Sequence, residues 1–330
     1  MAPASRRTFR PMGTSLVVDL VPSAAPEVAA DAALTAAVEL IAGTLGAYPD
    51  HLDVGGELHV TMCRHDDTAA DPGWPDVAAE HLADGIVVRC GSSTATVDHA
   101  SSTAVLDLAD SFLGIADAVR LFAEAAFTSV HVAARRLHAV HSALVVHDGV
   151  GLLLRGPSGA GKSTITYACL RRGMSMASDD WVYAPAGRPV DEVAGYPWRM
   201  MLTAPAAARF PELADIELVP HTSAEGWKLP VVPPVERRHV THTIDAVVLL
   251  DPDPDLQLRR AGGAEARQRF WDASLPVERD RLDVEWVDDL LARPTYVLQR
   301  GASPDDAAAA IAQLAHELAR STATTATEVP

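Results

Sequence analysis

The sequence has 330 residues, of which 48% are hydrophobic, and its formal net charge is −17. This length accommodates two modest domains with a sizeable core. A surface this acidic repels nucleic acid and anionic membranes, so neither is an expected partner. The sequence contains no run of about 18 apolar residues, so we expect no membrane-spanning segment.

The cysteines and the N-terminal stretch both indicate a cytoplasmic protein. Cys63, Cys90 and Cys169 are widely spaced and no CxxC motif occurs, as is typical of thiols in a reducing compartment. The stretch MAPASRRTFRP has arginines but no apolar region behind them, so we do not expect a secretory signal.

The N-terminal part of the chain predicts a mixture of helix and strand. Residues 24–46 are rich in alanine, and their large apolar residues recur at helical spacing. A second helix is predicted over 114–136. Between the two helices, four short runs of β-type residues predict strands: 57–63, 85–90, 94–99 and 103–108.

The C-terminal part alternates strand and helix, as an α/β core requires. Residues 139–147 and 150–155 predict a β-hairpin around the Asp-Gly turn at 148–149. A helix is predicted over 163–172, and a strand over 174–178 follows it. The proline-rich stretch 185–236 predicts loops and short strands. Later elements are predicted at 244–252 and 295–300 (strands) and at 286–292 and 303–320 (helices).

We therefore predict three parts of the chain. A small α+β N-terminal domain covers 1–112 and carries no motif with recognisable chemistry. An α/β domain over 113–321 carries the candidate catalytic residues, and a disordered tail covers 322–330.

The stretch GPSGAGKST at 156–164 fits the phosphate-binding pattern GxxxxGK[ST]. Its glycines allow the dihedral angles that turn backbone N–H groups toward an anion, and the helix that follows aims its positive end at the same place. We expect Lys162 to reach the β- and γ-phosphates of ATP and Ser163 to help hold Mg²⁺. The predicted nucleotide contacts are Gly156, Pro157, Ser158, Gly159, Ala160, Gly161, Lys162, Ser163 and Thr164.

Two adjacent carboxylates form the second signal. Asp179 and Asp180 follow Lys162 by 17 and 18 residues, an interval that holds one helix and one strand. That spacing brings both to the carboxyl end of the neighbouring strand, where open α/β sheets bind ligands. Transfer of phosphate to an alcohol needs a Mg²⁺ ligand and a base for the hydroxyl proton, and two acids can divide these duties.

His141 is the third candidate. With a two-residue hairpin loop at 148–149, the register predicts His141 opposite Gly156, where a histidine could orient an aspartate or meet phosphate oxygens. A satisfied strand histidine is the alternative, and a one-residue bulge would break this register.

Other residues are weaker candidates. Arg199 in YPWRM and Lys228 in EGWKLP could neutralise a transferring phosphate, although a lone cation in a loop is usually a surface residue. Asp251 ends the apolar run AVVLLD and competes with Asp180 for the metal, but the stretch DPDPDL that begins at Asp251 favours a turn.

The residues at 139–183 resemble the catalytic core of the HPr kinase/phosphorylase family, whose fold type is that of PEP carboxykinase. In that family's pattern a histidine precedes the P-loop lysine by 21 residues and an Asp-Asp pair follows it by 17 and 18, the places of His141, Asp179 and Asp180. The resemblance implies that Asp179 is the base for a serine hydroxyl and Asp180 a Mg²⁺ ligand. It also implies that His141 supports the first acid.

The family's later signature EIRGLG is absent, and GYPWRMML stands where it might fall. HPr as acceptor and the reverse, phosphorylase reaction are therefore left open. The chain more closely resembles the diverged HPr-kinase-like proteins of ribosomal-peptide gene clusters. Those implicated in lasso-peptide tailoring phosphorylate a serine of a precursor peptide, and relatives of this core often form homo-oligomers.

Three functional hypotheses remain at this stage. The first is an ATP- and Mg²⁺-dependent kinase that acts on a serine of a peptide or protein. The second is a kinase of the same fold that acts on free serine or a similar small alcohol. The third is a nucleotide-binding ATPase or regulatory module.

Overall fold

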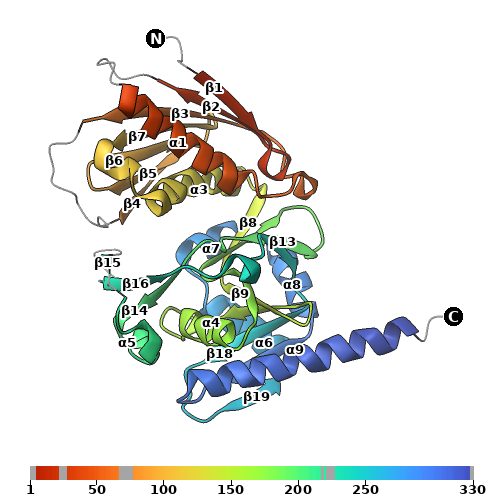
Figure 1. Ribbon diagram of the computed structural model, residues 1–330. Coiled ribbons are helices and arrows are strands. Elements are labelled where there is room, and N and C mark those ends of the chain that lie inside the picture. The colour runs from red at the N-terminus through yellow and green to blue at the C-terminus, as the bar shows by residue number, and fades with distance from the viewer. Residues whose placement is uncertain (1–4, 22–27, 67–76, 217–218, 221–226, 328–330) are drawn as a thin grey trace. The chain divides into compact units, whose positions relative to one another are not determined.

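The computed structural model describes residues 5–21, 28–66, 77–216, 219–220 and 227–327 (Figure 1). Its architecture is mixed α/β with several sheets. Backbone contacts divide the chain into two compact units: 1–137 with 217–228, and 138–216 with 229–330. This division lies after Leu137 and not at the predicted residue 112, because helix α3 (Ala116–Ala133) packs on strands of the first unit.

The first unit is built on a seven-stranded sheet of order β1-β2-β3-β7-β6-β5-β4. The pairs β2–β3 and β3–β7 are parallel and the remaining pairs are antiparallel. The strands are β1 (Ser5–Phe9), β2 (Ser15–Leu20), β3 (Glu57–His65), β4 (Val77–Leu82), β5 (Gly85–Cys90), β6 (Ser93–Asp98) and β7 (Thr103–Ala109). The four strands predicted between 57 and 108 are confirmed, and β1, β2 and β4 were missed.

Helices cover one face of this sheet, which explains the alternation along its strands. In β3 every second residue is buried, and Leu58, Val60 and Met62 form part of the core. Helix α1 (Val28–Leu45) contacts β3, and α3 contacts β5 and β6. The short pieces are α2 (Asp110–Leu113) and the 3₁₀ turns η1 (Pro11–Gly13) and η2 (Asp50–Leu52).

The second unit is built on a six-stranded sheet of order β11-β9-β10-β18-β20-β19. Strand β10 runs parallel to β18 and β18 parallel to β20, while the other pairs are antiparallel. The strands are β9 (Ala143–His147), β10 (Val150–Arg155), β11 (Ser175–Ser178), β18 (Ala246–Asp251), β19 (Gln257–Arg260) and β20 (Thr295–Gln299).

The predicted hairpin around residues 148–149 is confirmed. His147 pairs with Val150, and both turn residues, Asp148 and Gly149, have positive φ angles, of 51° and 76°. Two positive φ angles define the turn type that matches the twist of two-residue hairpins, and Asp-Gly is a favoured pair for it.

Two pairs of helices sandwich the six-stranded sheet. Helices α4 (Lys162–Arg171) and α9 (Pro304–Thr327) pack on each other and on β9. Helices α6 (Gly263–Asp272) and α8 (Val284–Ala292) instead share an apolar core with inward residues of β9, β10, β18 and β20. Helix α7 (Pro276–Arg281) joins them. Helices α6 and α7 were missed by the sequence patterns.

Helix α9 continues past the predicted end at residue 320 and reaches Thr327. The predicted disordered tail therefore overlaps the helix over 322–327, because the Thr and Ala residues of this stretch do not stop it. Residues 328–330 lie outside the described part of the chain.

A four-stranded sheet of order β17-β13-β12-β8 lies beside this core. Its strands are β8 (Leu137–His141), β12 (Trp181–Pro185), β13 (Glu192–Gly195) and β17 (Thr241–Thr243). The single strand predicted at 139–147 is thus wrong. The chain changes sheets at Ser142, so that β8 and β9 belong to different sheets.

The proline-rich stretch forms short elements, as predicted. A three-stranded sheet of order β14-β16-β15 comprises β14 (Met200–Thr203), β15 (Val219–Pro220) and β16 (Trp227–Val231). The remaining pieces are α5 (Ala204–Ala207) and the turns η3 (Pro211–Leu213) and η4 (Val235–Arg237). None of the helices in the described part of the chain is both long and apolar enough to cross a membrane.

Candidate functional site

A glycine loop, residues 156–161, connects the end of β10 to the start of α4. Gly159 and Gly161 have φ angles of 80° and 100°, which side chains other than glycine rarely adopt. Gly156 is restricted by space, since a β-carbon there would lie 2.9 Å from the β-carbon of Ala160. Both constraints keep the loop compact, so that its backbone can approach a bound ligand closely.

Lys162 is the first residue of α4 and its side chain folds back over the glycine loop. It is 7% exposed, and its Nζ donates a hydrogen bond of 2.9 Å to the Gly156 carbonyl. Burial lowers the pKa of Lys162 from its usual 10.5; the Asp180 and Asp179 carboxylates oppose that shift, while Arg155 adds to it. The ammonium therefore lies within electrostatic range of both predicted acids.

The remaining predicted nucleotide contacts surround this lysine. Pro157, Ser158 and Gly159 are exposed at the tip of the loop and Ala160 is buried. Ser163 and Thr164 are half-buried in the first turn of α4, where backbone N–H groups have no partner inside the helix.

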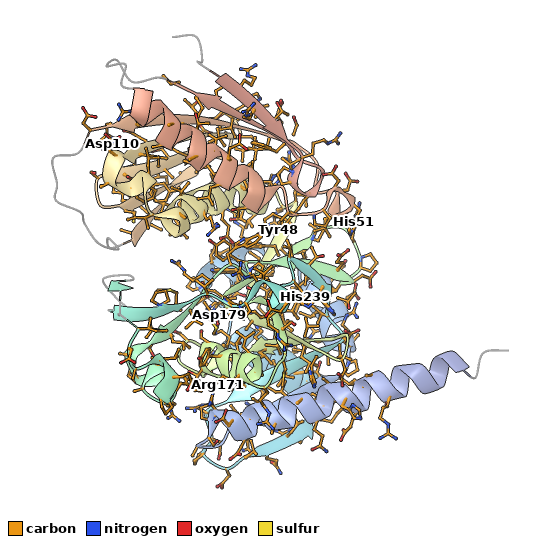
Figure 2. All side chains as sticks on the ribbon, viewed as in Figure 1. Tyr48, His51, Asp110, Arg171, Asp179 and His239 are labelled. Atoms are coloured by element: carbon orange, nitrogen blue, oxygen red, sulfur yellow. The ribbon has the colours of Figure 1, made fainter. Side chains whose placement is uncertain are left out.

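The two aspartates directly follow β11 and differ sharply in environment. Asp179 is 6% exposed, and its Oδ2 accepts a hydrogen bond of 3.2 Å from the backbone N–H of Met201. The side chain of Asp180 is 67% exposed. Figure 2 shows Asp179 inside the second unit, with Arg171 near the far end of α4.

His141 contacts the second aspartate. Its Nε2 lies 3.0 Å from Oδ1 of Asp180, and its ring centroid lies 5.5 Å from that of Trp181. This contact arises because β8 neighbours β12, which begins directly after Asp180. The support of Asp179 by His141 that the family resemblance implies stays a prediction.

The predicted register that placed His141 opposite Gly156 is wrong. The β9–β10 ladder ends with the pair Ala143 and Leu154, and the chain has left this sheet before it reaches His141. The histidine thus reaches the candidate site through the four-stranded sheet.

The sequence patterns missed two buried residues beneath the glycine loop. Arg155, the last residue of β10, and Glu278 on α7 form an ion pair of 2.9 Å whose side chains are both 0% exposed. The available signal was an arginine at the end of the apolar run VGLLLR, directly before the first glycine.

A third missed residue is Arg300, which follows β20. A β-carbon added to Gly161 would lie 3.3 Å from the Arg300 Cδ, so this side chain runs along the glycine loop. Asp251, the weaker metal candidate, lies at the end of β18 and pairs with Arg269 at 2.9 Å.

The two candidate phosphate contacts stay predictions. Arg199 stands two residues before Met201, the hydrogen-bond donor to Asp179. Lys228 lies on β16 and is the last residue of the segment 217–228 that groups with the first unit. Among the side chains that the structure describes, no cluster of three or more His, Cys, Asp or Glu residues could hold a metal ion by itself.

No family model matches the sequence. No curated protein matches it either. Among solved structures, that of the Hpr(Ser) kinase/phosphatase from Coxiella burnetii is similar to this chain, with 12% sequence identity and a TM-score of 0.30. The match covers 57% of this chain and 96% of the other. An identity and a TM-score this low say nothing about function.

Proposed function

We propose that this protein is an ATP-dependent kinase that transfers the γ-phosphate to a serine hydroxyl of a peptide or protein. The observation that carries the proposal is that Lys162, at the start of a helix behind a tight glycine loop, lies within electrostatic range of the carboxylates of Asp179 and Asp180. A site that only binds a nucleotide does not need a second, buried acid in addition to the acid that contacts the metal ion.

The glycine loop and the first turn of α4 would hold the triphosphate. Backbone N–H groups of the loop and the positive end of the helix both favour an anion at this place. Lys162 would exchange its bond to the Gly156 carbonyl for oxygens of the β- and γ-phosphates. Its burial strengthens that contact, because the dielectric around a buried ammonium is low.

The residues present fit a Mg²⁺ ion bound together with the nucleotide. Mg²⁺ usually keeps several waters and takes one or two protein oxygens plus phosphate oxygens, so a cluster of protein ligands is not required. Asp180 is exposed and Ser163 is half-buried at the helix start, and both would contribute oxygens. Bound there, the ion would neutralise charge on the phosphate oxygens.

Asp179 is assigned the role of base. Its carboxylate would accept the proton of the serine hydroxyl as that oxygen bonds to the γ-phosphorus, while the bond between the γ-phosphorus and the β,γ-bridging oxygen breaks and ADP leaves. The backbone N–H of Met201 fixes one oxygen of Asp179, which holds the carboxylate in place. His141 contacts Asp180, the proposed metal ligand.

The first prediction concerns this base. Asp179→Asn should leave ATP binding intact and lower phosphate transfer about 10²- to 10⁴-fold, the range for loss of a positioned acid or base. Transfer of labelled γ-phosphate to an acceptor and ATP affinity by calorimetry measure the two effects. Asp255→Asn, on an exposed turn, is the matched control. Normal transfer by Asp179→Asn would falsify the assignment.

The class of acceptor is proposed from the resemblance of residues 139–183 to the HPr kinase/phosphorylase family. We propose a precursor peptide of a lasso-type ribosomal-peptide cluster, and a short precursor encoded beside this gene would support it. Incubation with serine-containing peptides, free serine and other small alcohols separates a peptide kinase from a small-molecule kinase. ATP consumption with no phosphorylated acceptor would favour an ATPase or regulatory module.

A further inference from the structure

The stability of the fold alone does not explain the buried ion pair between Arg155 and Glu278. Both side chains are 0% exposed. Removing two charges from water costs several kcal/mol per ion, and a well-packed apolar pair at such a place is often as stable or more so. The pair must therefore be explained by what its hydrogen bonds hold.

The guanidinium of Arg155 ties the strand of the glycine loop to α6. Its Nε and Nη2 each lie 3.2 Å from the Phe270 carbonyl, and Nη2 donates a bond of 2.6 Å to Ser274 Oγ. The guanidinium carbon also lies 3.8 Å from the centroid of the Phe270 ring. These contacts fix the orientation of the arginine fork.

Glu278 Oε2 accepts the backbone N–H of Leu275 at 2.7 Å, at the start of α7. The other hydrogen bonds of the pair go to the place where the chain changes sheets. Glu278 Oε1 accepts both Arg155 Nη1 and the backbone N–H of His141, each at 2.9 Å. Arg155 Nη1 also lies 3.4 Å from the His141 carbonyl and 3.5 Å from Ser142 Oγ. Both backbone groups of His141 are thus held by this ion pair, at a point where strand pairing is interrupted.

We propose that Arg155 and Glu278 are positioning residues that hold the backbone of His141, and through it the ring against Asp180, in register with the glycine loop. Arg155 directly precedes Gly156, so one ion pair joins the loop and the histidine. The kinetic consequences given below rest on the proposed kinase function, whereas the structural consequences do not.

The opposite charges of the pair also matter for Lys162. The Arg155 guanidinium lowers the pKa of this lysine and the Glu278 carboxylate raises it. Their effects on the ammonium are therefore opposite, and a lone arginine beneath the loop would repel it.

The kinetic test removes both charges together, because an unpaired buried charge would unfold the site. Arg155→Met/Glu278→Leu should keep KM for ATP and lower kcat about 100-fold, the effect of a displacement of about 1 Å in a catalytic group. The control Arg267→Gln/Asp288→Asn removes an exposed ion pair between α6 and α8 and should leave both constants unchanged.

A second variant covers the case in which the double variant does not fold. Glu278→Asp keeps the charge beside Arg155 but is one methylene shorter, so it cannot reach both the guanidinium and the His141 N–H. We expect the same loss of kcat with KM for ATP retained. A thermal midpoint close to that of the wild type, by circular dichroism, shows that the variant is folded.

The structural test reads the histidine directly and does not require kinase activity. In protein labelled with ¹⁵N-histidine, the His141 ring signal, assigned by its loss in His141→Gln, should shift when Asp180→Asn removes its partner. In the double variant or in Glu278→Asp, the same Asp180→Asn change should no longer shift it.

The outcomes are distinct for the two proposals. A His141 signal that responds to Asp180→Asn equally in every background overturns the positioning role, as does an unchanged kcat. A variant of the pair that loses ATP binding as well as kcat also overturns the positioning role, because the pair would then be needed only for the structure of the glycine loop. A wild-type protein that phosphorylates no acceptor defeats the proposed function, while the ring signals still decide the role of the pair.

Discussion

Asp179 and Asp180 show how neighbouring residues of one type acquire different chemistry. The first is buried and takes a backbone hydrogen bond, and the second is exposed and paired with His141. Two carboxylates in different environments are the usual basis for separate roles in one site. The sequence predicted that the two acids divide the roles of base and metal ligand. Their different burial is the physical reason why we propose Asp179 as the base and Asp180 as the metal ligand.

Lys162 carries a cost in the folded protein without nucleotide, because burial disfavours its charged form. Lys162→Met should therefore leave thermal stability unchanged or raised, while it lowers phosphate transfer at least about 100-fold. Calorimetric melting and transfer assays measure the two effects. A large fall in melting temperature would contradict the explanation from burial.

Lys228 is the other lysine of the chain. Lys228→Met, assayed alongside Lys162→Met, decides whether this candidate takes part in transfer: a comparable loss of kcat in a stable variant would add it to the site.

His131 predicts a pH dependence in the first unit. It is fully buried, its Nε2 lies 3.1 Å from Thr14 Oγ1, and burial lowers its pKa from 6.5 to about 4. Since the unfolded chain binds the proton first, stability falls as pH falls from 6.5 toward 4, by up to about 3 kcal/mol. Urea unfolding across this range should show the fall, and His131→Gln should flatten it.

At the scale of elements, the approach of β13 to β11 supports the aspartates. A β-carbon at Gly195 would lie 2.1 Å from the Ala177 carbonyl oxygen, two residues before Asp179. Gly195→Ala should therefore displace the end of β11, with a loss of about 1–3 kcal/mol in stability and a clear loss of transfer.

Denaturant unfolding and the transfer assay check this prediction. Gly263→Ala, in the first turn of α6 where an added β-carbon meets nothing, is the control and should be neutral or stabilising. Equal effects of the two substitutions would show that the close approach does not matter.

The elements also show where local patterns were sufficient. Strand β3 and helix α3 were predicted within a few residues, because alternation and helical spacing each reflect one buried face. Strands β8 and β9 were predicted as one strand, because a change of sheet leaves the local pattern of apolar residues unbroken. Helix α9 was predicted too short, since nothing in its last residues signals a stop.

At the scale of the whole molecule, the two compact units predict separate responses to ligand. A non-hydrolysable ATP analogue with Mg²⁺, at about 100 times its dissociation constant, should stabilise the second unit by about 2.7 kcal/mol and leave the first unit's transition in place. Differential scanning calorimetry measures both transitions.

Lys162→Met is the control for this experiment and should abolish the shift. A shift confined to the first unit's transition would place the nucleotide elsewhere and would contradict the proposed site.

The sequence by itself determined the contiguous features of this protein: the glycine loop running into a helix, the hairpin before it, and the acidic pair at a strand end. Each depends on dihedral angles or spacings that neighbouring residues set. The tertiary structure decided that His141 meets Asp180 and that Arg155 meets Glu278, 123 residues away. Those contacts depend on which strands become neighbours and what is buried between them, and burial is a property of the folded whole.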